Sequence, residues 1–142
     1  MMPDLQSSLL CDDVRQERNG KFMLIGLFDG LALPAYPVVF PRLCMVNRWC
    51  CGNGSFMQQS RIIKPDGISI LAQGKPVQVN LQGAEANATC IEIFVNTRLE
   101  APGTYWVEVL LEKQLRLRYP LRAVVARRAA PPSAPPATPP AG

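Results

Sequence analysis

The adjacent cysteines Cys50 and Cys51 are residues whose type and spacing suggest chemistry. Vicinal thiols can oxidise or bind a soft metal ion, and the nearby Arg48 would lower the pKa of a thiolate. The other three cysteines, at positions 11, 44 and 90, are far from this pair in sequence. Zinc sites use clustered thiolates with short spacers and usually histidine. The pattern therefore keeps a thiol-based redox or metal sensor at Cys50 and Cys51 as one hypothesis, beside the simpler interpretation that all five cysteines are thiols without a function.

The chain contains no histidine, which removes the commonest general base, the usual activator of a nucleophile and the commonest metal ligand. Asp12 and Asp13 are adjacent and, together with Asp29, could hold a divalent cation through oxygen ligands. Neighbouring strand residues point to opposite faces, so we favour one solvated Asp and one bonded to a loop or to an arginine such as Arg15. We therefore predict no catalytic residue, no metal site and no cofactor, and the chain is not expected to be an enzyme.

Arginines gather toward the C-terminal end, at positions 116, 118, 122, 127 and 128, in a chain with 15 basic and 11 acidic residues and a net charge of +4. Arg116 and Arg118 are expected on one strand face, where Glu108 on the neighbouring strand can pair with them. Such a strip could bind phosphate, which makes a weak nucleic-acid or polyanion binder an alternative function. Nucleic-acid binders usually add exposed aromatic residues, and only Trp49 and Trp106 are candidates.

Trp106 is expected on the same outer face as Glu108 if Tyr105, Val107 and Val109 form the core. An exposed tryptophan flanked by Arg116 and Arg118 is typical of a protein-binding surface, and a tryptophan covered by a loop fits the pattern equally well.

Alternating side chains predict β-strands along most of the chain. The clearest signal is a strand over residues 89–97, a turn at Ala101-Pro102-Gly103, and a hairpin of strands over residues 105–111 and 115–119. Further strands are predicted over residues 5–15, 22–28, 38–49, 56–63, 68–71 and 76–81.

Glycine, asparagine and proline mark the expected turns. The turns are predicted at Asn19-Gly20, Gly52-Asn53-Gly54 and Pro65-Asp66-Gly67, and residues 29–37 are expected to be irregular. Gly26, inside an apolar strand, is expected to mark a bulge or a close approach. No segment has the length and period of an amphipathic helix, so we predict an all-β antiparallel sandwich of eight or nine strands.

The last residues, 129–142, consist of Pro, Ala, Ser, Thr and Gly, and we predict a disordered tail that follows a folded domain over residues 1–128. The tail is expected to be a spacer, with a polyproline ligand for an aromatic groove as the alternative. With a hydrophobic fraction of 48%, no run long enough for a membrane helix and no secretory signal pattern, a cytoplasmic protein that does not bind membranes is expected. A Cys44–Cys90 bridge becomes possible only if this compartment is wrong.

Several markers resemble those of an uncharacterised bacterial family of small proteins that carries a domain of unknown function. The markers are Cys11-Asp12, Arg15, Gly20-Lys21, the run from Leu24 to Asp29, Phe40-Pro41, Pro65-Asp66-Gly67, Pro102-Gly103 with Tyr105, and Tyr119-Pro120-Leu121. The resemblance spans about residues 5–125 and implies an immunoglobulin-like sandwich and a bacterial source. It implies no activity.

We therefore expect a non-enzymatic protein-binding or scaffolding module whose partner is an unidentified protein. The alternatives are the polyanion binder and the thiol sensor.

Overall fold

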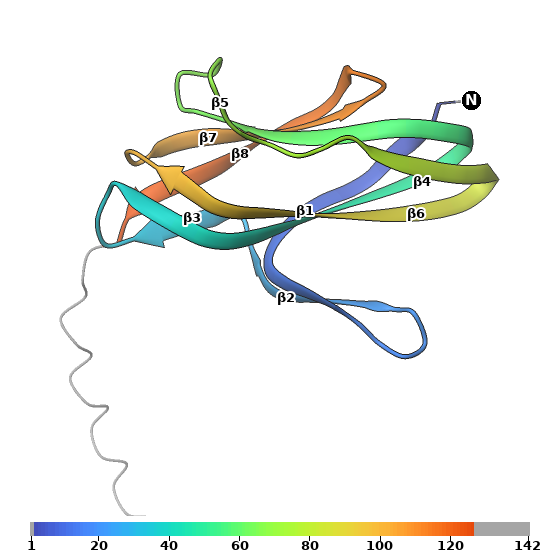
Figure 1. Cartoon of the computed structure of the whole chain (residues 1–142), viewed down its shortest axis with the longest axis horizontal. Coiled ribbons are helices and arrows are strands. Elements are labelled where there is room, and N and C mark those ends of the chain that lie inside the picture. The colour runs from blue at the N-terminus through green and yellow to red at the C-terminus, as the bar shows by residue number, and fades with distance from the viewer. Residues whose placement is uncertain (1, 127–142) are drawn as a thin grey trace, which may run out of the picture.

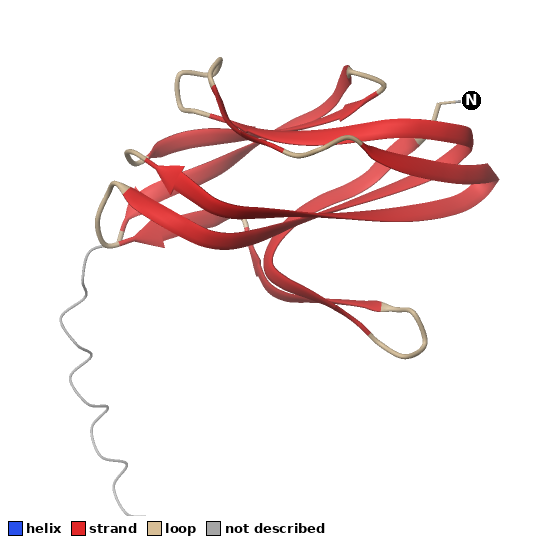
Figure 2. Cartoon of the chain, in the orientation of Figure 1, coloured by secondary structure: helices blue, strands red, loops and turns tan. Residues whose placement is uncertain are grey.

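The computed structural model describes residues 2–126 and consists of β-strands joined by short turns (Figure 1). The strands are β1 (Asp4–Gln16), β2 (Phe22–Phe28), β3 (Gly30–Leu33), β4 (Val38–Ile63), β5 (Ile70–Gln73), β6 (Val77–Leu99), β7 (Gly103–Leu111) and β8 (Gln114–Val125). None of the described residues belongs to a helix (Figure 2), so none forms a helix long and apolar enough to cross a membrane. The predicted tail, residues 129–142, lies outside the described residues.

The eight strands form one hydrogen-bonded sheet, which confirms the prediction of an all-β chain. Its main path runs β2-β1-β4-β7-β8-β3, while β5 and β6 pair with β4 off this path. All neighbouring strands are antiparallel except β3 and β8, which pair in parallel from Gly30 to Leu33. The sheet is continuous through β4 and is not divided into two separately hydrogen-bonded sheets.

The sheet curls so that its two halves face each other, and the long strands β4 and β6 run through both halves (Figure 1). The first half of β4 pairs with β1 and its last residues pair with β7. Strands β1 and β8 are not neighbours in the sheet, yet the Ser8 hydroxyl lies 2.9 Å from the Tyr119 hydroxyl. The result is an open half-barrel with a filled interior.

Strand β4 is longer than the sequence suggested, because the chain does not turn at Gly52-Asn53-Gly54. Cys51 has a φ of 61° and the pairing register between β4 and β6 shifts between Cys50 and Gly52, so a bulge bends the strand without ending it. Strand β6 is likewise one strand where two were predicted. The prediction of a turn at residues 52–54 was wrong because glycine permits a bend inside a strand as well as a turn.

Residues 29–37, expected to be irregular, contain the short strand β3. Four residues that pair in parallel with a distant strand leave no local signal that periodicity could detect.

The core fills the space between the two halves and holds the residues predicted to face it on β7. Tyr105 is 2% exposed, and Val107 and Val109 are fully buried. Trp49, which was a candidate for an exposed stacking residue, is also fully buried, so that prediction was wrong. A side chain of this size contributes several kcal/mol on burial, roughly 3–5 kcal/mol by comparison with truncation of large aromatic residues.

The predicted hairpin of β1 and β2 is present, with its turn at Asn19-Gly20; β2 has the predicted bounds, and β1 extends one residue further at each end. Gly26 has a φ of +69°, and the side chain of Asp12 lies directly against its Cα, which confirms the close approach expected there. The bend at Gly26 lets Leu24 pack on the outer face of the sheet while Phe28 packs in the core. The far end of the hairpin therefore stands away from the half-barrel (Figure 1).

Candidate binding site

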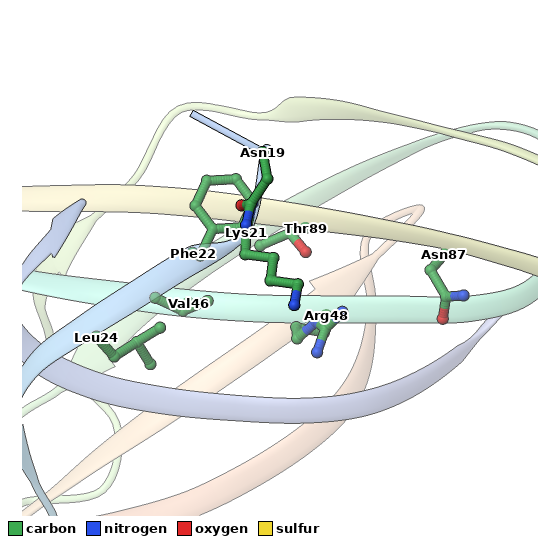
Figure 3. A pocket seen from close by; sticks show the side chains of 9 residues that line it. Asn19, Lys21, Phe22, Leu24, Val46, Arg48, Asn87 and Thr89 are labelled. Carbon is green, nitrogen blue, oxygen red and sulfur yellow. The ribbon is translucent and has the colours of Figure 1, made fainter. Parts of the chain in front are cut away.

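A hollow of about 720 Å³ opens between the β1–β2 hairpin and the outer face of β4 and β6. We call it the hairpin hollow, and it is lined by Asn19, Gly20, Lys21, Phe22, Leu24, Val46, Arg48, Asn87 and Thr89 (Figure 3). The turn and β2 supply the first five residues, β4 supplies Val46 and Arg48, and β6 supplies the last two. Residues from three separate parts of the chain thus form one concave surface.

Two cations face this hollow, since the Lys21 side chain reaches from the hairpin toward Arg48 on β4 (Figure 3). Within the described residues, neither Lys21 nor Arg48 forms an ion pair with a carboxylate. The floor is apolar, because Leu24 packs on Val46 beside the bend at Gly26. An anionic group with an apolar neighbour matches these walls, since two like charges that line one hollow favour a shared counter-ion.

The apolar surface continues beyond the hairpin hollow along the outer face of β6. Ile93 is 52% exposed and Val95 is 63% exposed, while Phe22 stands at the rim with 39% exposure. A second hollow, about 290 Å³ in volume, lies on the same face. Phe22, Ile91 and Ile93 line it together with Arg15 and Arg42, both of which pair with Asp13. The basic end at Lys21 and Arg48 is therefore followed by an apolar strip.

The proposed protein-binding residues on the other half of the sheet are only partly brought together. The Arg118 guanidinium lies 4.7 Å from the ring centre of Trp106, and its Nη1 is 3.7 Å from an oxygen of Glu108. Arg61 pairs with the same carboxylate at 2.6 Å. Trp106 is half-buried on the outer face, as expected, but it is covered by Arg118. A contact between Trp106 and a partner protein stays a prediction.

Arg116 is directed elsewhere and does not join Trp106. Its guanidinium donates to the backbone carbonyl of Pro3, 3.1 Å away, at the beginning of β1. A register shift between Val109 and Leu110 breaks the simple alternation that placed Arg116 and Arg118 on one face. Arg127 and Arg128, the other members of the expected phosphate-binding strip, lie outside the described residues.

The vicinal thiols lie at the bulge of β4, where both are half-buried. A hydrogen bond with Cys51, followed in size by burial, raises the pKa of the Cys50 thiol. This direction is opposite to the lowering expected from Arg48. Because the thiolate is the reactive form, a raised pKa argues against a reactive thiol at rest. The redox role of Cys50 and Cys51 stays a prediction.

The other three cysteines lie in apolar clusters, and Asp13 of the acidic pair is held by arginines. All five cysteines are free, and Cys44 and Cys90 belong to different apolar clusters, so they form no bridge. Asp13 pairs with Arg42 at 3.1 Å and with Arg15 at 3.4 Å. Among residues 2–126 there is no group of three or more Cys, Asp or Glu side chains placed to hold a metal ion.

Sequence reasoning missed a polar network inside the half-barrel. Asn47 donates to Ser60 at 2.8 Å and to Gln58 at 3.0 Å, and it lies 3.5 Å from Glu92. The Ser8 hydroxyl donates to the Asn47 carbonyl at 2.6 Å. The available signal was a polar residue at an inward-facing position of an otherwise apolar strand, as at Glu92 between Cys90 and Phe94.

Comparison with solved structures shows similarity in fold to an alkylpurine DNA glycosylase, AlkC of Pseudomonas fluorescens, bound to DNA that contains an abasic site analog. The two share 12% identity with a TM-score of 0.51, over 87% of this chain and 30% of that one. The chain thus spans less than a third of that protein's length, and at this identity the likeness concerns the fold alone. No curated protein gives a significant match.

A family model matches residues 6–124, which include nearly all of the described sheet and both walls of the hairpin hollow. The expected resemblance to an uncharacterised family is thereby confirmed. The chain belongs to this family of unknown function, DUF6941.

Proposed function

We propose that this chain is a non-enzymatic protein-binding module that holds an acidic segment of a partner protein in the hairpin hollow. The observation that carries the proposal is the pair of cations, Lys21 and Arg48, which face one concave surface without a carboxylate among the described residues. A carboxylate of the partner would be their shared counter-ion.

The apolar strip supports a peptide as the occupant in preference to a free anion. An exposed ion pair is worth only about 0–1 kcal/mol, so two cations alone give weak binding. Apolar contact with Phe22 and with the exposed Ile93 and Val95 would supply most of the affinity. The preferred segment therefore has an Asp or Glu at one end, followed by apolar residues. The cations set its direction and its rate of association.

We propose a module without catalytic activity because its residues lack the usual catalytic groups. The chain has no histidine, and the pKa of the Cys50 thiol is raised. Asp13 is paired with Arg15 and Arg42. Neither hollow on the outer face brings together a nucleophile and a base.

We also infer that the curled sheet is an immunoglobulin-like sandwich in a bacterial cytoplasmic protein. The two facing halves around one core and the short hairpin connections support the first part. Five free thiols in a chain of 142 residues favour a reducing compartment.

The test is affinity capture with the wild-type chain and with a Lys21→Glu, Arg48→Glu double variant, after nuclease treatment of the lysate. We expect a captured protein to be lost with the double variant and to bind again as an isolated acidic peptide. Arg18→Glu is the matched control, because Arg18 lies in the same turn but does not line the hollow. Equal capture by the wild type and the double variant would contradict the proposal.

The polyanion binder is the alternative that the same experiment separates. Arg118 is engaged by Glu108 and Trp106, and Arg116 by the Pro3 carbonyl, so this alternative has lost two of its residues to internal contacts. Capture that disappears with nuclease and falls steeply as salt rises would favour it, because phosphate binding releases counter-ions.

A further inference from the structure

A third hollow, which we call the edge hollow, opens at the side of β6 and leads toward the polar network. Its volume is about 570 Å³, and the segment Gln73–Lys75 forms one wall while β6 forms the other. Glu92, Phe94, Thr97 and Val77 line it together with that segment. It shares no lining residue with the hairpin hollow, although Ile93 and Val95 of the apolar strip also line it.

Two polar side chains in this hollow are more than nine-tenths buried and lack partners. Glu92 and Thr97 are each 6% exposed, and among the described residues the Glu92 Oε1 and the Thr97 Oγ1 have no hydrogen-bond partner. The other carboxylate oxygen of Glu92 has only the long 3.5 Å contact with Asn47. An amide has two N–H groups, and those of Asn47 have shorter bonds to Ser60 and Gln58. The Glu92 carboxylate is therefore poorly satisfied on both oxygens.

Gly74, in the wall opposite Glu92, leaves room for the carboxylate. A Cβ on Gly74 would collide with Glu92 Oε1, so the bare Cα of Gly74 accommodates the carboxylate at the inner end of the hollow. Lys75 also lines the hollow, but it is exposed and forms no ion pair with Glu92 within the described part of the chain. A buried carboxylate costs several kcal/mol unless a cation or hydrogen bonds compensate for lost solvation.

We propose that the edge hollow binds a primary ammonium group carried on an alkyl chain. An ammonium carries a full positive charge and three N–H donors, so one group would neutralise the Glu92 carboxylate and also donate to its unpartnered Oε1. A guanidinium prefers the two oxygens of one carboxylate side by side, and here Oε2 is turned toward Asn47. Phe94 and Val77 offer apolar surface for the alkyl chain. The group belongs either to a free alkylamine or to a lysine side chain of another protein.

The experiment titrates the full chain with n-butylammonium chloride and follows backbone amide shifts by NMR. We expect saturable shifts at Gly74 and Glu92, with a dissociation constant of about 1 mM, which is within reach of a ligand this small. Neutral n-butanol is the matched ligand, and equal shifts with n-butanol would overturn the proposal because the charge would then be irrelevant.

Two variants link the binding to the carboxylate. Glu92→Gln keeps the shape of the side chain and removes its charge, and we expect affinity to fall at least about tenfold. Glu85→Gln changes an exposed glutamate on the same strand and should leave affinity unchanged. Should Glu92→Gln fail to fold, Val77→Ala provides the second test, because it removes apolar surface offered to the alkyl chain, with an expected loss of several-fold. Unchanged binding in the folded Glu92→Gln variant would refute the site.

Further ligands show whether the ammonium belongs to a free alkylamine or to a lysine side chain. Tighter binding of Nα-acetyl-lysinamide than of n-butylammonium supports a lysine side chain, and the reverse order supports a free alkylamine. Binding of n-butylammonium to Lys75→Gln but not to the wild type would overturn the proposal, since the chain's own Lys75 would then be the cation. These results are independent of the proposed function, because the hairpin hollow variants leave Glu92 unchanged.

Discussion

The hairpin hollow and the edge hollow differ in where they place their charges. Lys21 and Arg48 stand exposed on a surface that water reaches, whereas Glu92 is 6% exposed inside the half-barrel. An exposed charge keeps most of its hydration, but a buried one depends on its protein partners. The two sites are therefore built differently: substitutions at the edge hollow should change the stability of the fold, while those at the hairpin hollow should change binding alone.

The largest expected effect is at Asn47, which holds the polar network beside the edge hollow. Asn47→Ala removes the donors to Ser60 and Gln58 and the acceptor of Ser8, so buried polar groups lose their partners. We expect the free energy of unfolding to fall by roughly 3 kcal/mol. Urea denaturation measures this.

Asn80→Ala is the matched control for Asn47→Ala. Asn80 also accepts a hydrogen bond, from Ser55 at 2.7 Å, but this pair is exposed. We expect a change below about 0.5 kcal/mol. Similar losses in both variants would show that the interior network is no more costly to disturb than the surface.

The second prediction concerns the loss of stability at alkaline pH. Its source is the thiol of Cys90, which lies two residues before Glu92 on β6. Burial, with a smaller contribution from the Glu92 carboxylate, raises the pKa of Cys90 from 9.0 to about 11. The folded chain therefore keeps a proton that the unfolded chain releases. Stability from this group is unchanged below pH 9 and falls as pH rises from 9 toward 11, by about 2–3 kcal/mol in total.

Denaturation midpoints between pH 8 and pH 11, compared for the wild type and Cys90→Ala, measure this loss. The pKa values of Tyr105 and Tyr119 are also raised by burial, so both proteins lose stability at high pH. Only the difference between the two curves reports the thiol. Parallel curves over this range would rule out the buried thiol as a cause of alkaline destabilisation.

How far the sequence predicted these regions depends on the distance between the residues involved. Strands β1, β2, β7 and β8 follow from two-residue alternation and from local turns, such as the one at Glu112 and Lys113, both with positive φ. Sequence reasoning divided β4 at its glycines because a bulge and a turn have the same local composition. Pairing with β6, which lies many residues away in the sequence, determines whether these glycines form a bulge or a turn.

The two hollows escaped prediction for different reasons. Lys21 and Arg48 line one hollow only because the hairpin stands beside the outer face of β4, and no spacing in the sequence encodes that arrangement. Glu92 carried a signal, since alternation places it on the same face as Cys90 and Phe94, both of which are buried. A charged residue between two core positions is informative, whereas a lysine in a hairpin turn is ordinary.

The third prediction concerns the bend at Gly26, which sets the direction of the hairpin that forms one wall of the hairpin hollow. Gly26→Ala puts a side chain on a residue with a φ of +69° and against Asp12, so we expect a loss of about 2 kcal/mol in stability. Gly20→Ala is the control, because Gly20 has a φ of +89° but no atom within 4 Å of the added Cβ. Its expected cost is about 1 kcal/mol. A loss no greater at Gly26 than at Gly20, measured by thermal unfolding, would mean that contact with Asp12 does not hold the bend.

The smallest expected effect on stability is at the cations themselves. Lys21→Gln and Arg48→Gln each leave an exposed polar side chain in place, and neither cation has an ion-pair partner among the described residues, so each change should stay within about 0.5 kcal/mol. Removing one of the two like charges should raise stability slightly in low salt, because their repulsion is then screened only in part. If chemical denaturation instead shows that either substitution costs as much as Asn47→Ala, then Lys21 and Arg48 support the fold. The contrast between a binding surface and a structural interior would then fail at the hairpin hollow, while the edge hollow would keep its separate test with n-butylammonium.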